Sequence, residues 1–278
     1  MNNQALTTVC EQLGVVKQTP VTGGSINECF CLETVSGRQY FLKVNEHMPA
    51  AFFEKEQTGL LELSHCARVP RVVALGNRHL VLEWIEAGSW ANKGWQDLAE
   101  QLANLHSQRA QVFGFLEDNY CGENPQFNPK NEDGFDFFAQ QRLMVQARWA
   151  REKDLLTTQE VNQVSALGQN LKNWIPEQEP ARIHGDLWSG NILVNQQQQA
   201  FLVDPACYWG WPEADIAMSH LFGGFGDAFY QHYQTLFPFE PGFSERVPLY
   251  NLYHLLNHLN LFGGSYHSSV MAVLKRFA

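Results

Sequence analysis

The sequence predicts an α+β protein made of a small antiparallel sheet and a larger, mainly helical part. Two patterns predict this. Up to about residue 86, short runs of β-branched and aromatic residues alternate with turns rich in Gly, Ser and Asn, which is typical of paired strands. After Gly88, apolar residues recur at three- and four-residue steps over longer segments, which is typical of helices. We therefore expect two lobes, residues 1–86 and residues 87–278.

Composition narrows the class of protein. The 278 residues are 45% hydrophobic and 17% charged, which is ordinary for a globular chain. The formal net charge of −10 argues against a nucleic-acid partner, because such proteins use basic surfaces to displace phosphate counterions. We see no signal peptide and no apolar span of about 18 residues, so we expect a cytoplasmic protein with no membrane partner. The six cysteines show no metal-binding spacing, and Cys29 and Cys31 are more typical of buried thiols than of a redox pair.

A glycine-rich turn connects the first two predicted strands, at residues 15–21 and 29–33, which follow a short helix at residues 6–13. The turn contains Gly23, Gly24, Ser25 and Asn27. Glycine lets the backbone come close to an anion, and the N–H groups of such a turn can face a phosphate. The pattern predicts a phosphate-covering loop, although a plain β-hairpin produces the same pattern.

A lysine in the third predicted strand needs a partner. Lys43 lies within the apolar run of residues 39–44, where an unpaired ammonium group is costly. The helix that follows has an inward stripe broken by one carboxylate, Glu56. The apolar members of that stripe are Phe52, Phe53, Leu60 and Leu63. The two patterns predict an ion pair between Lys43 and Glu56, with a surface lysine and a separate structural pair as the alternative.

Beyond these elements, strands are predicted at residues 69–74 and 80–84, and helices at residues 135–149, 161–174 and 250–262. Another helix starts near Asp97, a candidate N-cap, and residues 120–134 form a loop that could border a substrate. His254 and His258 are four residues apart on the last helix. We expect them to serve packing rather than bind a metal, because no HExxH motif accompanies them.

The most informative stretch is residues 183–206. Apolar triplets at residues 192–194 and 201–203 flank a polar run, which predicts a hairpin. The hairpin brings Asn191 and Asp204 together, and Asp186 lies on the loop that enters it. An aspartate that accepts a hydroxyl proton and two oxygen ligands for Mg²⁺ are what phosphoryl transfer requires. The sequence therefore predicts Asp186 as a catalytic residue and Asn191 and Asp204 as metal ligands.

The order of these residues resembles the catalytic loop and metal site of the protein-kinase-like superfamily. His184-Gly185-Asp186 is similar to the aminoglycoside phosphotransferase branch, and Trp188 to Asn191, with Asp204 to Ala206, resembles the fructosamine (ketosamine) kinase family. The resemblance implies a two-lobed fold with ATP and Mg²⁺ as cofactors. It also implies that Lys43 binds phosphates, that Asp215 holds the catalytic loop, and that a hinge binds adenine. That hinge is Glu83, Trp84 and Ile85.

The implied activity is phosphorylation of a sugar hydroxyl on a ketosamine, at O3 by family resemblance, in the removal of glycation adducts. The acceptor is either a free ketosamine such as fructosamine or ribulosamine or a glycated lysine. Two alternatives remain open: a related kinase for an aminoglycoside, a thiosugar or an amino alcohol, and a nucleotide-binding regulator without turnover.

Overall fold

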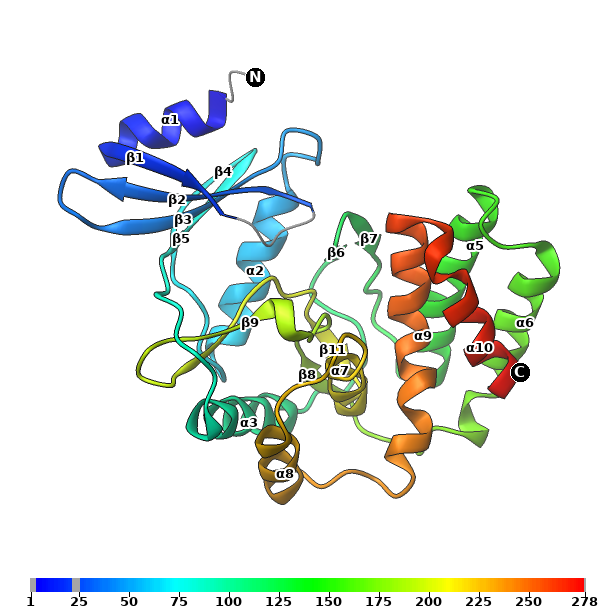
Figure 1. The fold of residues 1–278 in the computed structure, drawn as a ribbon. Coiled ribbons are helices and arrows are strands. Elements are labelled where there is room, and N and C mark those ends of the chain that lie inside the picture. The colour runs from blue at the N-terminus through cyan, green and yellow to red at the C-terminus, as the bar shows by residue number, and fades with distance from the viewer. Residues whose placement is uncertain (1–3, 22–25, 278) are drawn as a thin grey trace.

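The computed structural model describes residues 4–21 and 26–277. Its first part is an antiparallel sheet in the strand order β1-β2-β3-β5-β4, at the upper left of Figure 1. The strands are β1 (Val15–Pro20), β2 (Glu28–Thr34), β3 (Gln39–Val44), β4 (Val72–Gly76) and β5 (His79–Glu83). β4 begins later than predicted because Pro70, which lacks an N–H donor, precedes it.

Each face of this sheet packs against one helix. Val9 of α1 (Gln4–Leu13) packs with Leu42 and Val81 on one face. Phe53 of α2 (Phe52–Ser64) packs with Leu80 on the other. Leu80 and Val81, which are adjacent in β5, thus pack on opposite faces of the sheet, as the alternation of side chains in a strand requires. The predicted inward stripe of α2 is confirmed.

The C-terminal half of α2 belongs to a different core. Leu63 is fully buried in the large cluster formed mainly by the helical part. A Cβ added at Gly59 would lie 3.0 Å from the Pro205 Cγ, so α2 is in close contact there with the segment that follows β10. α2 is therefore packed against both lobes at once.

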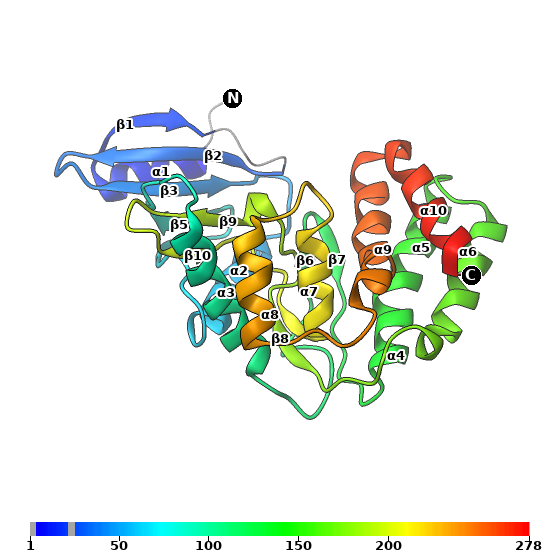
Figure 2. The ribbon, with the colours of Figure 1, turned by 60° about the horizontal axis from the view of Figure 1, so that its bottom comes forward.

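The second part is mainly helical, and Figure 2 shows its helices beside and below the sheet. Its main helices are α3 (Asn92–Ser107), α4 (Gly134–Phe137), α5 (Val145–Glu152), α6 (Thr158–Gln169), α7 (Pro212–Ser219), α8 (Asp227–Leu236), α9 (Phe243–Phe262) and α10 (His267–Phe277), and a π-helical segment, Phe138–Met144, joins α4 to α5. Three two-stranded ladders complete it: β6 (Asn119–Cys121) with β7 (Asn124–Gln126), β8 (Ala181–Ile183) with β11 (Tyr208–Gly210), and β9 (Ile192–Val194) with β10 (Ala200–Leu202). The predicted α+β class with a small sheet and a helical lobe is confirmed.

Three local predictions are wrong. Asp97 is not an N-cap, because α3 already begins at Asn92; its Oδ2 instead accepts hydrogen bonds from Arg68 Nη1 at 2.9 Å and Ala200 N at 2.7 Å. The helix predicted to reach residue 174 ends at Gln169, because Asn170 leaves helical geometry before Pro176 is reached. The predicted loop at residues 120–134 contains most of the β6–β7 hairpin.

The last strand of the sheet ends at Glu83, and α3 begins at Asn92. Between them, Gly88 N donates to Val194 O at 2.7 Å, which joins the connecting segment to the β9–β10 hairpin. The division into residues 1–86 and 87–278 is compatible with this, and we keep it as a proposal. Among residues 4–21 and 26–277, no helix is both long enough and apolar enough to span a bilayer.

Candidate active site

A cavity of about 390 Å³ lies between the sheet and the helical lobe. The sheet side contributes Lys43 and the segment Glu83 to Ile85. The helical side contributes Asp186, Asn191 and Asp204. Residues that lie far apart in the sequence and were predicted to share a site therefore line one cavity.

Lys43 is the most deeply buried charge in this cavity. Its Nζ lies 2.7 Å from Glu56 Oε1 and also contacts Asp204 Oδ1, and its side chain is only 3% exposed. Burial lowers the pKa of Lys43, but the carboxylates of Asp204 and Glu56 outweigh this effect and raise the pKa above its usual value. Burial raises the pKa of Glu56 to about 7, against the opposing effect of Lys43. The predicted pair therefore exists, and Lys43 remains an ammonium that links α2 to Asp204.

The catalytic loop that follows β8 is fixed by its backbone. Asp215, on α7, accepts hydrogen bonds from His184 N at 2.6 Å and Gly185 N at 2.8 Å. Gly185 has a φ of +83°, and a Cβ there would collide with the Ala206 carbonyl oxygen, so only glycine fits. Asp215 thus holds the loop, as expected from the family resemblance.

Asp215 itself is held by a buried histidine. His106 Nε2 lies 3.2 Å from Asp215 Oδ2, and His106 Nδ1 lies 2.7 Å from the Tyr233 hydroxyl. Although burial raises the pKa of Asp215, hydrogen bonding to His106 and to the loop backbone lowers it overall. The carboxylate is therefore charged at neutral pH and is a strong acceptor for the loop N–H groups.

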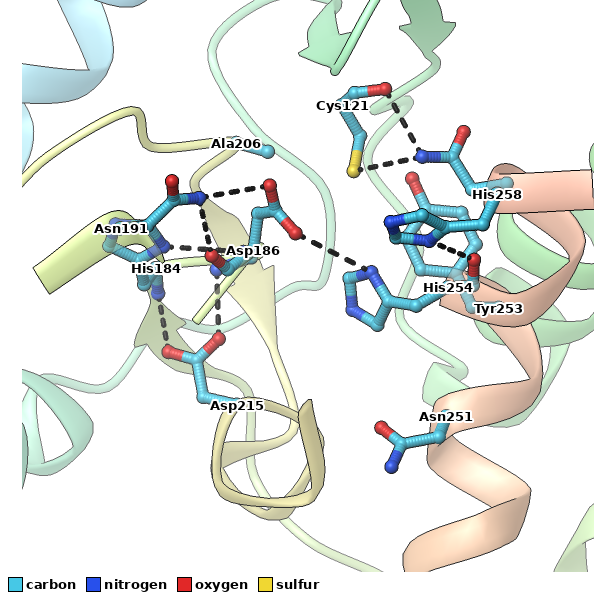
Figure 3. Close-up of polar contacts among 12 residues, drawn as sticks. Cys121, His184, Asp186, Asn191, Ala206, Asp215, Asn251, Tyr253, His254 and His258 are labelled. Carbon is cyan, nitrogen blue, oxygen red and sulfur yellow. Dashed lines mark hydrogen bonds and ion pairs between the residues drawn. The ribbon is translucent and has the colours of Figure 1, made fainter. Parts of the chain in front are cut away.

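Asp186 extends from this loop into the cavity (Figure 3). Asn191 Nδ2 donates to Asp186 O at 2.9 Å and to its Oδ2 at 3.0 Å, which fixes the carboxylate. Burial raises the pKa of Asp186 to about 7; the hydrogen bond from Asn191 lowers it, whereas Asp204 and Asp215 add to the increase. A carboxylate with such a pKa is a better proton acceptor than an ordinary one.

Asp204 follows β10 by two residues and has a conformation that is rare for a residue other than glycine. Its φ is +54°, and its side chain is 44% exposed in the cavity. Val203 N donates to Asn191 O at 3.0 Å, so the metal ligands predicted at 191 and 204 are neighbours. The side-chain nitrogen of Asn191 donates to Asp186, which leaves its side-chain oxygen, Oδ1, free of that bond. Together with the Asp204 carboxylate, this oxygen is of the hard type that Mg²⁺ prefers.

The residues predicted to bind the nucleotide are distributed as follows. Glu83, Trp84 and Ile85 line the cavity, as does Asn27, whose Oδ1 accepts from Asn45 Nδ2 at 3.1 Å. The remaining predicted residues of the glycine turn lie outside the described residues. They are Gly23, Gly24 and Ser25.

Sequence reasoning assigned no role in the site to several other residues in or near this cavity. Trp188 and His258 line it, and Tyr120 contributes from β6. His254 is buried and packed, as expected, and it also places its Nδ1 3.9 Å from Asp186 Oδ1. The four-residue spacing of the two histidines was a usable signal for them. Tyr120 begins the stretch at residues 120–134 that was expected to border a substrate, and it does line the cavity.

The fold and this site define a kinase of the protein-kinase-like class, because a buried Lys–Glu pair faces an Asp-bearing loop with an Asn and an Asp beside it. The chain belongs to the fructosamine kinase family, whose model matches residues 1–278. It is 45% identical over 268 residues to a probable ketoamine kinase of Enterococcus faecium, covering 94% of this chain and 95% of the relative.

Two further relatives support the same membership. A chloroplastic protein-ribulosamine 3-kinase of Arabidopsis thaliana is 35% identical over 276 residues, covering 94% of this chain and 82% of the plant protein. The solved structure of a candidate fructosamine-3-kinase from Thermobifida fusca is 31% identical, with a TM-score of 0.88 and coverage of 99% of this chain and 98% of that one. The expected family is confirmed, and the protein is an ATP-dependent kinase of the kind that phosphorylates ketosamines.

Proposed function

We propose that the protein transfers the γ-phosphoryl group of ATP to the O3 hydroxyl of a ketosamine sugar. The observation that carries this proposal is Asp186, a carboxylate with a pKa of about 7 that is held by Asn191 and lines the cavity also lined by Lys43. Asp186 accepts the proton of the attacking hydroxyl, or orients that hydroxyl, while transfer proceeds. The protein contributes mainly position and charge neutralisation, with no covalent intermediate.

The other side chains have roles in nucleotide binding. Lys43 binds the α- and β-phosphates and is oriented by Glu56, while the backbone of Glu83, Trp84 and Ile85 binds adenine. Asn27, which lines the cavity, lies near the phosphates; the phosphate-binding role of Gly23, Gly24 and Ser25 stays a prediction from the sequence. Asn191 and Asp204 hold Mg²⁺, which supplies neutralisation of phosphate charge when bound.

The acceptor lies against aromatic residues of the helical lobe that line the cavity, among them Tyr120, Trp188 and His258. Aromatic surfaces suit a sugar ring or its amine substituent. The names of the relatives, ketoamine kinase and protein-ribulosamine 3-kinase, favour a ketosamine over an aminoglycoside or an amino alcohol. Both a free ketosamine and a glycated lysine fit this proposal, and glycation repair in the cytoplasm would be its setting. The six free cysteines are compatible with a reducing compartment.

A coupled ADP-release assay tests this function. Fructosyl, ribulosyl and erythrulosyl amines should support turnover, whereas choline and an aminoglycoside should not, and NMR of the product should place the phosphate on O3. Faster turnover of an aminoglycoside or of choline would reject the ketosamine assignment. Binding of MgATP without turnover of any acceptor would favour a regulator.

A matched variant tests the role of Asp186. Asp186→Asn keeps the shape of the side chain but removes the proton acceptor. We expect kcat to fall by roughly 10²-fold or more, the usual scale for a lost general base, while the affinity for MgATP stays nearly unchanged. An unchanged kcat would contradict the assignment.

A further inference from the structure

A second group of ligand-type side chains meets at Asp186, which lines the cavity, and its other two members are buried. Cys121 ends β6, Asp186 lies on the catalytic loop, and His254 lies in the middle of α9. One ligand atom from each lies within 4.8 Å of the other two. Figure 3 shows the three side chains pointing toward a common centre. Three separate segments thus converge on one point.

His254 lacks a hydrogen-bond partner that its burial requires. The residue is 5% exposed, and among the described residues its buried Nδ1 has no hydrogen-bond partner, since Asp186 Oδ1 is 3.9 Å away. Burial, together with neighbouring His258, lowers the pKa of His254 to about 3, so the ring is neutral. A neutral imidazole nitrogen that is buried and unpaired costs free energy unless a ligand engages it.

Cys121 is positioned by a network of buried amides. Asn257 Nδ2 donates to Cys121 Sγ at 3.4 Å and to its carbonyl oxygen at 3.2 Å. The Asn257 Oδ1 accepts in turn from Asn124 Nδ2 at 2.8 Å and from Gln146 Nε2 at 3.1 Å. The sulfur is therefore fixed in direction, which is the function that outer hydrogen-bond partners serve around metal ligands.

We propose that Cys121, Asp186 and His254 form a three-ligand site for a thiophilic divalent cation, with Zn²⁺ as the best fit. Sulfur, imidazole nitrogen and carboxylate oxygen are ligands of Zn²⁺, whereas Mg²⁺ and Ca²⁺ bind oxygen. With metal–ligand bonds of about 2.0–2.3 Å, the ligand atoms of a tetrahedral site stand roughly 3.5 Å apart. The 3.9 Å between His254 Nδ1 and Asp186 Oδ1 is close to that separation. On binding, the metal replaces the Cys121 thiol proton, which passes to solvent.

Metal bound at this site would inhibit the enzyme, because Asp186 is both a ligand of the site and the proposed proton acceptor in phosphoryl transfer. An Asp186 carboxylate bound to Zn²⁺ can no longer accept the proton of the acceptor hydroxyl, so Zn²⁺ should compete with the acceptor and not with MgATP. This consequence depends on the function proposed above, whereas the metal site itself does not.

Binding is measured first, without activity. Co²⁺ is titrated into the full-length protein to detect the charge-transfer absorption of a thiolate–Co²⁺ bond, and Zn²⁺ affinity is measured by competition with a chelator. We expect one metal per chain. Cys121→Ser should abolish the absorption band, and His254→Asn should weaken Zn²⁺ binding by more than the 10–100-fold typical of losing an outer partner.

Matched controls are available on a different surface. Cys66→Ser and His65→Ala replace a cysteine and a histidine that do not line the cavity, and both variants should keep the wild-type band and affinity. Thermal melts confirm that each variant is folded. If Cys121→Ser does not fold, His254→Asn is used to test the site. A wild-type protein without the band, or a band that survives Cys121→Ser, would overturn the site.

Activity is measured second, as the ratio of turnover with and without Zn²⁺ for each variant. Inhibition should be strong in the wild type, relieved by excess acceptor, and weak in Cys121→Ser and His254→Asn. Binding at this site without inhibition would leave the metal site standing and would refute the role of Asp186 as proton acceptor.

Discussion

Replacing Lys43 should expose how strongly Glu56 depends on it. Lys43→Met keeps most of the volume of a side chain that is 3% exposed but removes the ammonium 2.7 Å from Glu56 Oε1. Glu56 is itself only 12% exposed, so its charge loses its partner without gaining water. Removing one member of a buried ion pair costs about 3–5 kcal/mol. Asp204 also loses a partner, but at 44% exposure its share of the cost is small.

This cost should depend on pH in a defined direction. The pKa of Glu56 in the folded wild type is already raised to about 7, and loss of Lys43 raises it further. In the unfolded chain the pKa is about 4.3. Below about pH 7 Glu56 is protonated in both folded proteins, so its share of the variant's penalty relative to the wild type is absent there; it grows as the pH rises through 7 and is complete only above the still higher folded pKa of the variant. Lys43→Met should therefore be much less destabilised at pH 5.5 than at pH 9.

Urea denaturation at both pH values, with the double variant Lys43→Met/Glu56→Gln, measures the effect. The double variant should recover most of the lost free energy of unfolding, and its remaining loss should not depend on pH. This corresponds to a coupling between the two residues of up to about 3 kcal/mol. Turnover should be non-additive in the same way. Lys55, on the same helix as Glu56, forms a partly exposed ion pair with Glu117, so Lys55→Met should cost no more than about 1 kcal/mol at either pH. Equal losses at both pH values, or a double variant equal to the sum, would refute the coupling.

Further predictions concern three aspartates and the state of the isolated enzyme. Asp204→Asn should weaken nucleotide binding in a way that high Mg²⁺ partly rescues, and a titration at several Mg²⁺ concentrations that rescued Asp186→Asn instead would reverse their roles. Because the pKa of Asp186 is about 7, kcat/KM for the acceptor should fall as the pH drops below this value, and bound Mg²⁺ should move this decline to lower pH. Asp215→Asn, at a site 1% exposed, should cost about 3 kcal/mol of stability in urea denaturation and lower kcat, since the N–H groups of His184 and Gly185 lose a charged acceptor. Protein shown by mass spectrometry to be unphosphorylated should be fully active, and a requirement for phosphorylation would contradict this.

Much of the site could be predicted because local patterns determine it. The triplets around Asn191 and Asp204 form the predicted hairpin, and one carboxylate on an apolar stripe is enough to identify Glu56 as the partner of Lys43. In each case the chemistry follows from the period of a strand or a helix, which the sequence carries directly. These predictions needed no information on how distant segments pack.

The parts that could not be predicted depend on distant packing. Asp97 has the residue type of an N-cap, but its partners Arg68 and Ala200 come from distant parts of the chain, and α3 starts elsewhere. Cys121 and His254 are brought to Asp186 by a short hairpin and a long helix, and no spacing in the sequence encodes that meeting. Even the noticed histidine pair gave no indication of which ring would face the loop.

The double packing of α2 has a consequence for how the enzyme is controlled. In a kinase whose glutamate-bearing helix can swing, moving that helix breaks the Lys–Glu pair and switches the enzyme off. Here Leu63 is buried in the core of the helical lobe, and Gly59 lies close to Pro205, directly after Asp204. Swinging α2 outward would open that core, which costs too much to serve as a routine switch. Control of such an enzyme therefore has to act on what enters the cavity, whether substrate or an inhibitory metal, and not on the position of this helix.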